Sequence, residues 1–449
     1  MAKTFREWNV DQAWLLPPSV RDLVPASDPA HFIRELVREE LNLDAVLDTY
    51  AEERGFPPYH PVMMTALLLF SYTQGVRSSR KIARACQTRV DFMAVTAMQQ
   101  PDFRTVNKFR LRHLEALASL FGQVLHLCQK AGMVKLGHVA LDGTKIQANA
   151  SKHKAMSYER MKKTEKELKA DIEKWFADSK TTDEEEDREF GEDKRGDEMP
   201  EWVTNKQKRL EVIRAAKAEM EAEARAQLEA GVKPAPEKPE GDGPQKPPRG
   251  NKGKPPKKNG EPNDKAQMNF TDAASKLLKG PNGFLQGYNC QAAVDSKAQV
   301  IVAHSAAAAQ ADAPELIPML QQIRENVGRN PVELSADTGY LSEANLRELR
   351  RRRIRAYIAV GREKAATETK PKRRRSRGPL SCAMRKKLRL AGHRSRYRLR
   401  KQVVEPVFGQ MKEGLAMRRM LMRGIKKVRH EWAMACTAHN LLKLARRAA

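Results

Sequence analysis

Residues 137–148, GHVALDGTKIQA, are the first β-like segment of the chain, and the next β-like runs lie within residues 284–305. In the first segment Val139 and Leu141 face one side of a predicted strand, while Asp142 faces the other. If these segments form strands of one sheet, about 135 residues separate the first strand from the next. We expect an α/β fold in which a large insertion follows the first strand.

Residues 1–135 show the spacing of short amphipathic helices. Tight turns join these helices, and Arg77, Arg80, Lys81 and Arg84 are expected to be exposed between them. This pattern predicts a helix-turn-helix-like DNA-binding unit, although a plain helical bundle with solvated arginines would give the same pattern. The net charge of +27 favours DNA contact, because so positive a field attracts polyanions.

Residues 151–230 interrupt the predicted sheet with two helical patterns, over residues 156–178 and 205–230. The acidic connection between them is too charged to form a core, so we expect an antiparallel helical hairpin. Residues 231–268 follow and are rich in Lys, Pro and Gly. That composition favours a disordered basic linker that stays close to DNA.

Residues 284–305 contain two β-rich runs around a short polar turn, which predict an antiparallel hairpin. Residues 331–340, PVELSADTGY, alternate in polarity and predict a strand that ends at Asp337. A further strand is predicted over residues 355–361. Asp312 is expected to cap the helix that follows it.

Residues 396–412, RYRLRKQVVEPVFGQMK, predict a basic amphipathic helix that carries one carboxylate, Glu405. Arg398 and Lys401 lie seven and four residues before Glu405, and Lys412 lies seven residues after it. In one continuous helix these four side chains share a face. Such a face suits a metal ion and a phosphate backbone, although a surface helix with ordinary ion pairs would look the same.

Asp142, Asp337 and Glu405 are far apart in sequence, yet a sheet flanked by helices can bring them together. Three converging carboxylates repel one another unless divalent cations neutralise them. Two Mg²⁺ ions about 3.5–4 Å apart can activate water or a 3′-hydroxyl for attack on phosphate. Each Mg²⁺ needs only one or two carboxylates, because phosphate and water complete its shell.

The order of these motifs resembles that of DDE transposases of bacterial insertion sequences. The motifs that carry the resemblance are VALDGTKI, GYNCQAAVD, ELSADTGY and VVEPVFGQMK. The resemblance implies an α/β fold with a ribonuclease H-like catalytic core, interrupted by a helical hairpin insertion and preceded by an all-α N-terminal domain. The implied boundaries are 1–135 for the N-terminal DNA-binding domain, 136–150 and 269–449 for the core, 151–230 for the insertion and 231–268 for the linker.

One departure from the related group concerns the helix that carries Glu405. The group has tyrosine and arginine at the positions that Arg398 and Lys401 fill here, whereas Tyr397 and Arg400 each lie one residue earlier. Lys401 can still meet phosphate as a point charge. The role of Tyr397 is left open, because one residue turns a helix by about 100°.

The resemblance implies an enzyme that binds the terminal inverted repeats of its insertion sequence, cuts the DNA strand and joins the freed 3′-hydroxyl to target DNA. Two Mg²⁺ or Mn²⁺ ions would be held by Asp142, Asp337 and Glu405. A homodimer or higher oligomer on double-stranded DNA is expected, because two ends must be held together. The expected DNA contacts are Arg398, Lys401, Lys412, Arg77, Arg80, Arg373, Arg374 and Arg375.

Two other functions fit the same residues. One is a catalytically inactive DNA-binding regulator derived from a transposase, and the other is a metal-dependent nuclease that cuts without joining. A membrane protein is not expected, because the longest apolar run, residues 61–70, is too short to span a bilayer. No signal peptide or paired-cysteine zinc pattern is recognised, so we expect a cytoplasmic, nucleoid-associated protein.

Overall fold

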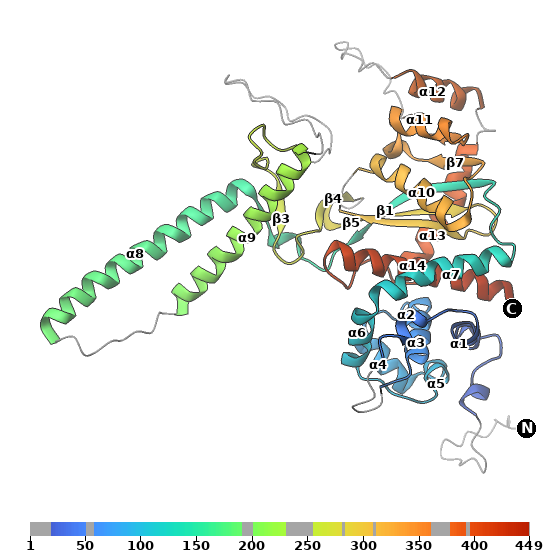
Figure 1. Ribbon diagram of the computed structural model, residues 1–449, viewed down its shortest axis with the longest axis horizontal. Coiled ribbons are helices and arrows are strands. Elements are labelled where there is room, and N and C mark those ends of the chain that lie inside the picture. Colours follow the sequence, from blue (N-terminus) through green and yellow to red (C-terminus); the bar gives the residue numbers. More distant parts are fainter. Residues whose placement is uncertain are drawn as a thin grey trace, which may run out of the picture. The chain divides into compact units, whose positions relative to one another are not determined.

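A computed structural model of the chain is shown in Figure 1. It describes residues 19–50, 58–190, 201–229, 255–280, 283–308, 311–360, 378–391 and 396–448. The predicted DNA-binding residues Arg373, Arg374 and Arg375 lie outside these ranges, as does part of the predicted linker, residues 231–254.

The chain divides into two compact units. The first unit comprises Met1–Val134, Gly409–Ala416 and Met434–Ala449, and the second comprises Lys135–Phe408 and Met417–Ala433. Two helices therefore contribute residues to both units, namely α13 (Leu399–Glu413) and α14 (Ile425–Ala448).

The N-terminal part of the first unit is helical throughout its described residues, which confirms the sequence prediction for this region. Its elements are the 3-10 turn η1 (Val20–Leu23), α1 (Pro29–Glu39), α2 (Asp44–Leu47), α3 (Pro61–Thr73), α4 (Ser79–Thr88), α5 (Val90–Thr96), α6 (Phe103–Arg112) and α7 (Leu114–Lys130). Helix α3 is apolar on almost every side and is therefore buried on almost every side, with Leu67, Leu68 and Phe70 fully inaccessible.

The second unit is built on a mixed six-stranded sheet with the order β4-β5-β1-β7-β8, in which β6 also pairs with β5. The strands are β1 (His138–Gln147), β4 (Lys276–Gly280), β5 (Gly283–Asp295), β6 (Ile301–Ala307), β7 (Glu333–Ala336) and β8 (Arg355–Ile358). The pairs of β5 with β1, β4 and β6 are antiparallel, and β7 runs parallel to both β1 and β8. The predicted hairpin and the predicted strands before Asp337 and after residue 354 are therefore present.

Helices cover this sheet. α10 (Leu316–Val327) packs on β6, and α11 (Glu343–Arg351) and α12 (Pro379–Ala391) pack on β8. Trp432 of α14 is fully buried, and its indole N–H donates to the carbonyl of Gln291 on β5 over 3.0 Å. Consecutive residues of the central strands β5 and β7 are buried, so both faces of these strands are covered.

The insertion after β1 consists mainly of two long helices, α8 (Tyr158–Phe190) and α9 (Glu201–Glu229), with the small pair β2 (Ala155–Ser157) and β3 (Gln267–Asn269) at its base. Hydrogen bonds and ion pairs join Tyr158 to Glu221, Glu165 to Lys217 and Asp171 to Lys206. The partner numbers on α9 fall as those on α8 rise, so the two helices run antiparallel. Buried Met161, Ile213 and Met220 fill the space between them.

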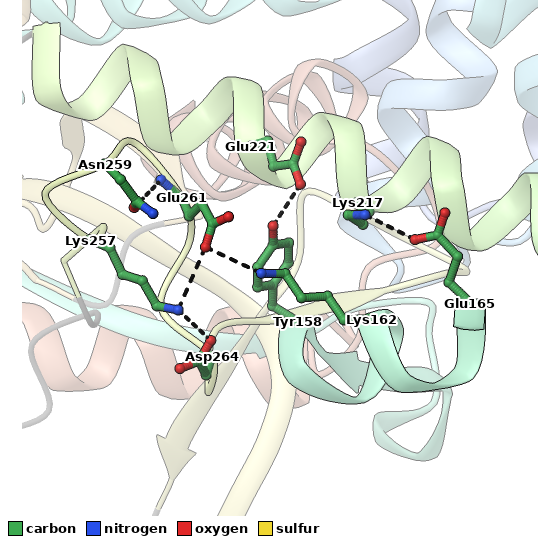
Figure 2. A network of polar contacts seen from close by, with 9 residues as sticks. All are labelled: Tyr158, Lys162, Glu165, Lys217, Glu221, Lys257, Asn259, Glu261 and Asp264. Carbon is green, nitrogen blue, oxygen red and sulfur yellow. Dashed lines mark hydrogen bonds and ion pairs between the residues drawn. The ribbon is translucent and has the colours of Figure 1, made fainter. Parts of the chain in front are cut away.

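The last part of the predicted linker is folded. Residues 255–266 lie against the base of α8, where Figure 2 shows a network of polar contacts. Lys257 Nζ lies 2.7 Å from Asp264, and Lys162 of α8 lies 3.2 Å from Glu261. The prediction of an unstructured linker over 231–268 therefore does not hold for residues 255–268.

Among the described helices, none combines the length and apolar character needed to cross a bilayer.

Candidate catalytic centre

Asp142 and Asp337 each follow directly after the paired stretch of β1 and β7. The parallel pairing of β1 with β7 ends at Leu141 and Ala336, and each aspartate is the next residue. Asp142 is not at the end of its own strand, because β1 continues beside β5 as far as Gln147. The strand pattern therefore brings the first two predicted carboxylates together, as the sequence indicated.

Burial raises the pKa of Asp142 to about 6. The negative charges of Asp337 and Asp312 also raise it, while Arg400 and the backbone N–H of Gly143 lower it. Burial likewise raises the pKa of Asp337, partly offset by the N–H of Gly339, which donates to its carboxylate over 2.8 Å. Buried like charges of this kind call for a nearby cation.

Arg400 supplies such a cation. Its guanidinium forms an ion pair with Asp142, and only 12% of its side chain is exposed. The same guanidinium lies over the ring of Tyr397, with 5.8 Å from Cζ to the ring centroid. Tyr397 therefore lies beside the arginine that pairs with Asp142, although both residues stand one position away from those expected from the related group.

The start of α13 explains this shift. The α-helix begins at Leu399, and the preceding residues, Arg396–Arg398, form a 3-10 turn. Arg398 therefore lies outside the helix, and the face expected from a continuous helix does not include it. Arg398 and Lys401 are both exposed, so the cation that neutralises Asp142 is Arg400 rather than either of them.

Glu405 lies on an exposed face of α13. It is not among the main charges that shift the pKa of Asp142 or Asp337. Within the described residues, no group of three or more His, Cys, Asp or Glu side chains is arranged to hold a metal ion. The role of Glu405 as a third ligand stays a prediction, and so does the phosphate contact of Lys412.

Asp312 is the residue of this centre that the sequence did not reveal. The sequence predicts that Asp312 caps a helix, yet its side chain makes no capping bond to the turn that follows, Ala313–Glu315. Its Oδ1 instead accepts hydrogen bonds from Asn289 Nδ2 over 2.6 Å and Gln291 Nε2 over 2.9 Å. Two amides at alternate positions of a buried strand are a signal that could have located this acceptor.

Tyr340 fixes the orientation of the Gln291 amide. Its buried hydroxyl donates to Gln291 Oε1, so the Nε2 donor of the amide is directed to Asp312. Burial and the neighbouring aspartates raise the pKa of Tyr340 well above its usual range, so it remains a donor. A chain of hydrogen bonds therefore runs from Tyr340 through Gln291 to Asp312.

Two glycines allow these groups to approach one another. A Cβ at Gly143 would lie 2.8 Å from Gln291 Nε2, and a Cβ at Gly339 would collide with Asp312 and lie 2.9 Å from Asp337 Oδ1. Both glycines lie within the motifs that carry the two aspartates, one residue after Asp142 and two residues after Asp337. Any larger residue there must displace the polar groups around the centre.

The arginines predicted in the first unit differ in exposure. Arg77 is buried, and its guanidinium donates to the carbonyl of Ala416. The expectation that Arg77 is exposed is therefore wrong, because its guanidinium is used within the unit. Arg80, Lys81 and Arg84 are exposed on α4 as expected.

Comparison with protein-family models gave two matches. Residues 264–441 match the model described as the transposase DDE domain, and residues 18–112 match the model described as a transposase domain of the DUF772 type. The first match contains Asp337, Arg400 and Glu405, while Asp142 precedes it. Searches of curated proteins and of solved structures gave no match.

Proposed function

We propose that this chain, which its two matched domains indicate to be a DDE transposase, binds the terminal inverted repeats of its insertion sequence and catalyses metal-dependent strand cleavage and strand transfer. The observation that carries the proposal is the convergence of Asp142 and Asp337 beside the last pairing of β1 with β7. Burial raises the pKa of both carboxyl groups, and the charge of Asp337 raises that of Asp142 further, which supports a site made for cations.

The donor set fits Mg²⁺ or Mn²⁺ that binds together with DNA. Asp142 and Asp337 supply two carboxylates, and Mg²⁺ usually takes one or two and completes its shell with water and phosphate oxygens. Two bound ions would activate the attacking oxygen and stabilise the leaving oxygen. Glu405 is proposed as the third carboxylate on the strength of the family motif alone.

In this proposal Arg400 and the side-chain amides of Asn289 and Gln291 act on different carboxylates. Arg400 balances the charge of Asp142, and Asn289 with Gln291 holds Asp312 beside the two aspartates. Arg398 and Lys401 are exposed, and we propose that they contact phosphates of bound DNA. Lys412 and the basic residues Arg373, Arg374 and Arg375 are proposed as further phosphate contacts from sequence.

The proposed fold of the catalytic part is a ribonuclease H-like core. Support comes from the mixed sheet with β1 at its centre, from the helices that cover it and from the helical insertion after β1. We also propose a homodimer or higher oligomer on DNA and a place at the nucleoid, because transposition must hold two DNA ends together.

The test uses labelled DNA that flanks the gene, a plasmid target, and either Mg²⁺ or EDTA. The wild type should join the labelled end to the plasmid only with Mg²⁺, and Asp142→Asn and Glu405→Gln should abolish joining. Glu219→Gln, a change at an exposed carboxylate of α9, should leave joining intact.

Two results would favour the other functions. Tight binding without cleavage under any condition would point to a regulator. Cleavage that never proceeds to joining, even when a free 3′-hydroxyl is supplied, would point to a nuclease.

A further inference from the structure

Two arginines from different helices share one aromatic ring in the first unit. The guanidinium carbons of Arg80 on α4 and Arg104 on α6 lie 5.2 Å and 5.6 Å from the centroid of Phe103. Each contact is a favourable cation–π interaction. Together they bring two positive charges to one place on the surface.

The two helices are locked together beneath these arginines. Ile82 and Cys86 of α4 and Val106 of α6 are fully buried. Arg110 of α6 is also buried, and its guanidinium donates to the carbonyl of Arg77 over 2.9 Å and to the hydroxyl of the first residue of α4. The exposed faces of α4 and α6 therefore form one rigid surface.

Further cations extend this surface along both helices. Arg84 lies one turn beyond Arg80, and Lys108 lies one turn beyond Arg104, so each helix presents two cations about 6 Å apart along its axis. Lys81 is also exposed on α4. A single DNA strand carries one charge per about 3.4 Å of helix axis, so this spacing suits a phosphate backbone.

These charges are not neutralised within the described part of the chain. No ion pair to a described carboxylate is found for Arg80, Lys81, Arg84, Arg104 or Lys108. The lysines of the insertion differ, because those in Figure 2 each contact a carboxylate. Much of the positive charge of the insertion is therefore balanced locally, whereas that of α4 and α6 is available to a partner.

We propose that the exposed faces of α4 and α6, defined by Arg80, Lys81, Arg84, Arg104 and Lys108, form a surface that grips the phosphate backbone of double-stranded DNA. The inference rests on the proposed function and locates DNA binding on the matched DUF772 segment. Guanidiniums held over a ring suit phosphate oxygens. This surface positions DNA and does not read its sequence.

The test compares two double variants of the full chain that lose the same charge. Arg80→Gln/Arg104→Gln removes two unpaired cations. Lys163→Gln/Lys169→Gln removes two cations that pair with Glu167 and Glu173 on α8, at 3.8 Å and 3.5 Å. Fluorescence anisotropy measures the binding of two duplexes of equal length, one of flanking DNA and one of random sequence. The NaCl concentration is varied from about 0.05 to about 0.3 M, a range that includes physiological salt.

For the first variant we expect the slope of log affinity against log salt to fall by about 1.8, since each phosphate contact contributes about 0.9. Affinity at 0.15 M salt should fall at least about tenfold for both duplexes. The second variant should match the wild type. Equal slopes for all three proteins would overturn the inference, as would an equal loss in both variants, which would reflect net charge alone.

Loss of folding is checked by thermal unfolding, and Lys81→Gln/Lys108→Gln provides a second variant with the same expected change in slope. The plasmid-joining assay separates this inference from the proposed function. If the wild type joins DNA but both surface variants keep the salt slope of the wild type, the proposed DNA-binding surface is refuted and the proposed function stands. If the surface variants have a lowered salt slope but the wild type cleaves no DNA, the DNA-binding surface is supported and the proposed enzymatic function is refuted.

Discussion

Arg400 donates a charge-assisted hydrogen bond to Asp142, so the helix that carries the predicted third carboxylate also neutralises the first. This pairing balances one of the negative charges that Asp142, Asp337 and Asp312 bring to the centre. A metal ion bound by Asp142 would therefore compete with Arg400 for the charge of this carboxylate.

The substitution Arg400→Gln should raise the pKa of Asp142 above about 6, because Arg400 lowers it in the wild type. Asp142 binds a cation only when ionised, so metal binding and cleavage should rise with pH through the pKa. The midpoint of the pH profile should therefore move upward in the variant. Mn²⁺ affinity by calorimetry and Mg²⁺-dependent cleavage between about pH 5 and 8 measure this shift. The matched control Arg398→Gln changes an exposed arginine and should leave the midpoint in place.

The substitution Asp312→Asn should move the same midpoint in the opposite direction. The charge of Asp312 raises the pKa of Asp142, so its removal lowers that pKa. The variant also loses an acceptor for Asn289 or Gln291, which should lower the free energy of unfolding by about 1–3 kcal/mol. An unchanged midpoint in a stable variant would show that Asp312 serves only to hold the two amides.

The substitution Gly339→Ala should separate Asp312 from Asp337, because the new methyl group would occupy the space between them. We expect a loss of stability of about 1–3 kcal/mol and a fall in the cleavage rate of about a hundredfold. Gly122→Ala in α7 is the control. Its Cβ would meet no atom within 4 Å, so activity should persist and stability should rise by about 0.5–1 kcal/mol. Full activity of Gly339→Ala would mean that the spacing of these carboxylates is unimportant.

The substitution Tyr158→Phe should loosen the base of the insertion. Tyr158 is fully buried and donates to Glu221 over 2.6 Å, as Figure 2 shows. Burial and Glu221 raise the pKa of Tyr158, so the hydroxyl keeps its proton at neutral pH. Loss of this bond to a charged group should cost about 1.5–3 kcal/mol and should speed amide hydrogen exchange in α9. Exchange in α3 of the first unit should not change, and equal acceleration there would indicate global destabilisation instead.

The strands that carry Asp142 and Asp337 could be predicted from sequence because alternation and apolar runs are local signals. Their meeting followed from the parallel neighbours β1 and β7. The sequence also predicts helix α13, but with a start at residue 396, whereas the α-helix begins at Leu399. The chain forms a 3-10 turn over Arg396–Arg398, and Arg400 lies over the ring of Tyr397; no spacing rule contains either feature.

Asp312 and Arg77 show what sequence patterns do not predict. Both are polar residues beside helices, and the usual expectation is a cap for the first and solvent for the second. Each instead contacts a segment distant in sequence, β5 for Asp312 and residue 416 for Arg77. Contacts of this kind depend on tertiary structure, so sequence patterns alone do not reveal them.

The separation of β1 from β5 in the chain has a consequence for the timing of biosynthesis. These strands are direct neighbours in the sheet, yet the entire insertion is translated between them. At about 5–20 residues per second, the partner of β1 leaves the ribosome on the order of ten seconds after β1 itself. Asp337 and Arg400 emerge later still. A nascent or prematurely terminated polypeptide therefore contains Asp142 without Asp337 and Arg400, and the ion pair of Asp142 with Arg400 is confined to chains whose translation has passed α13.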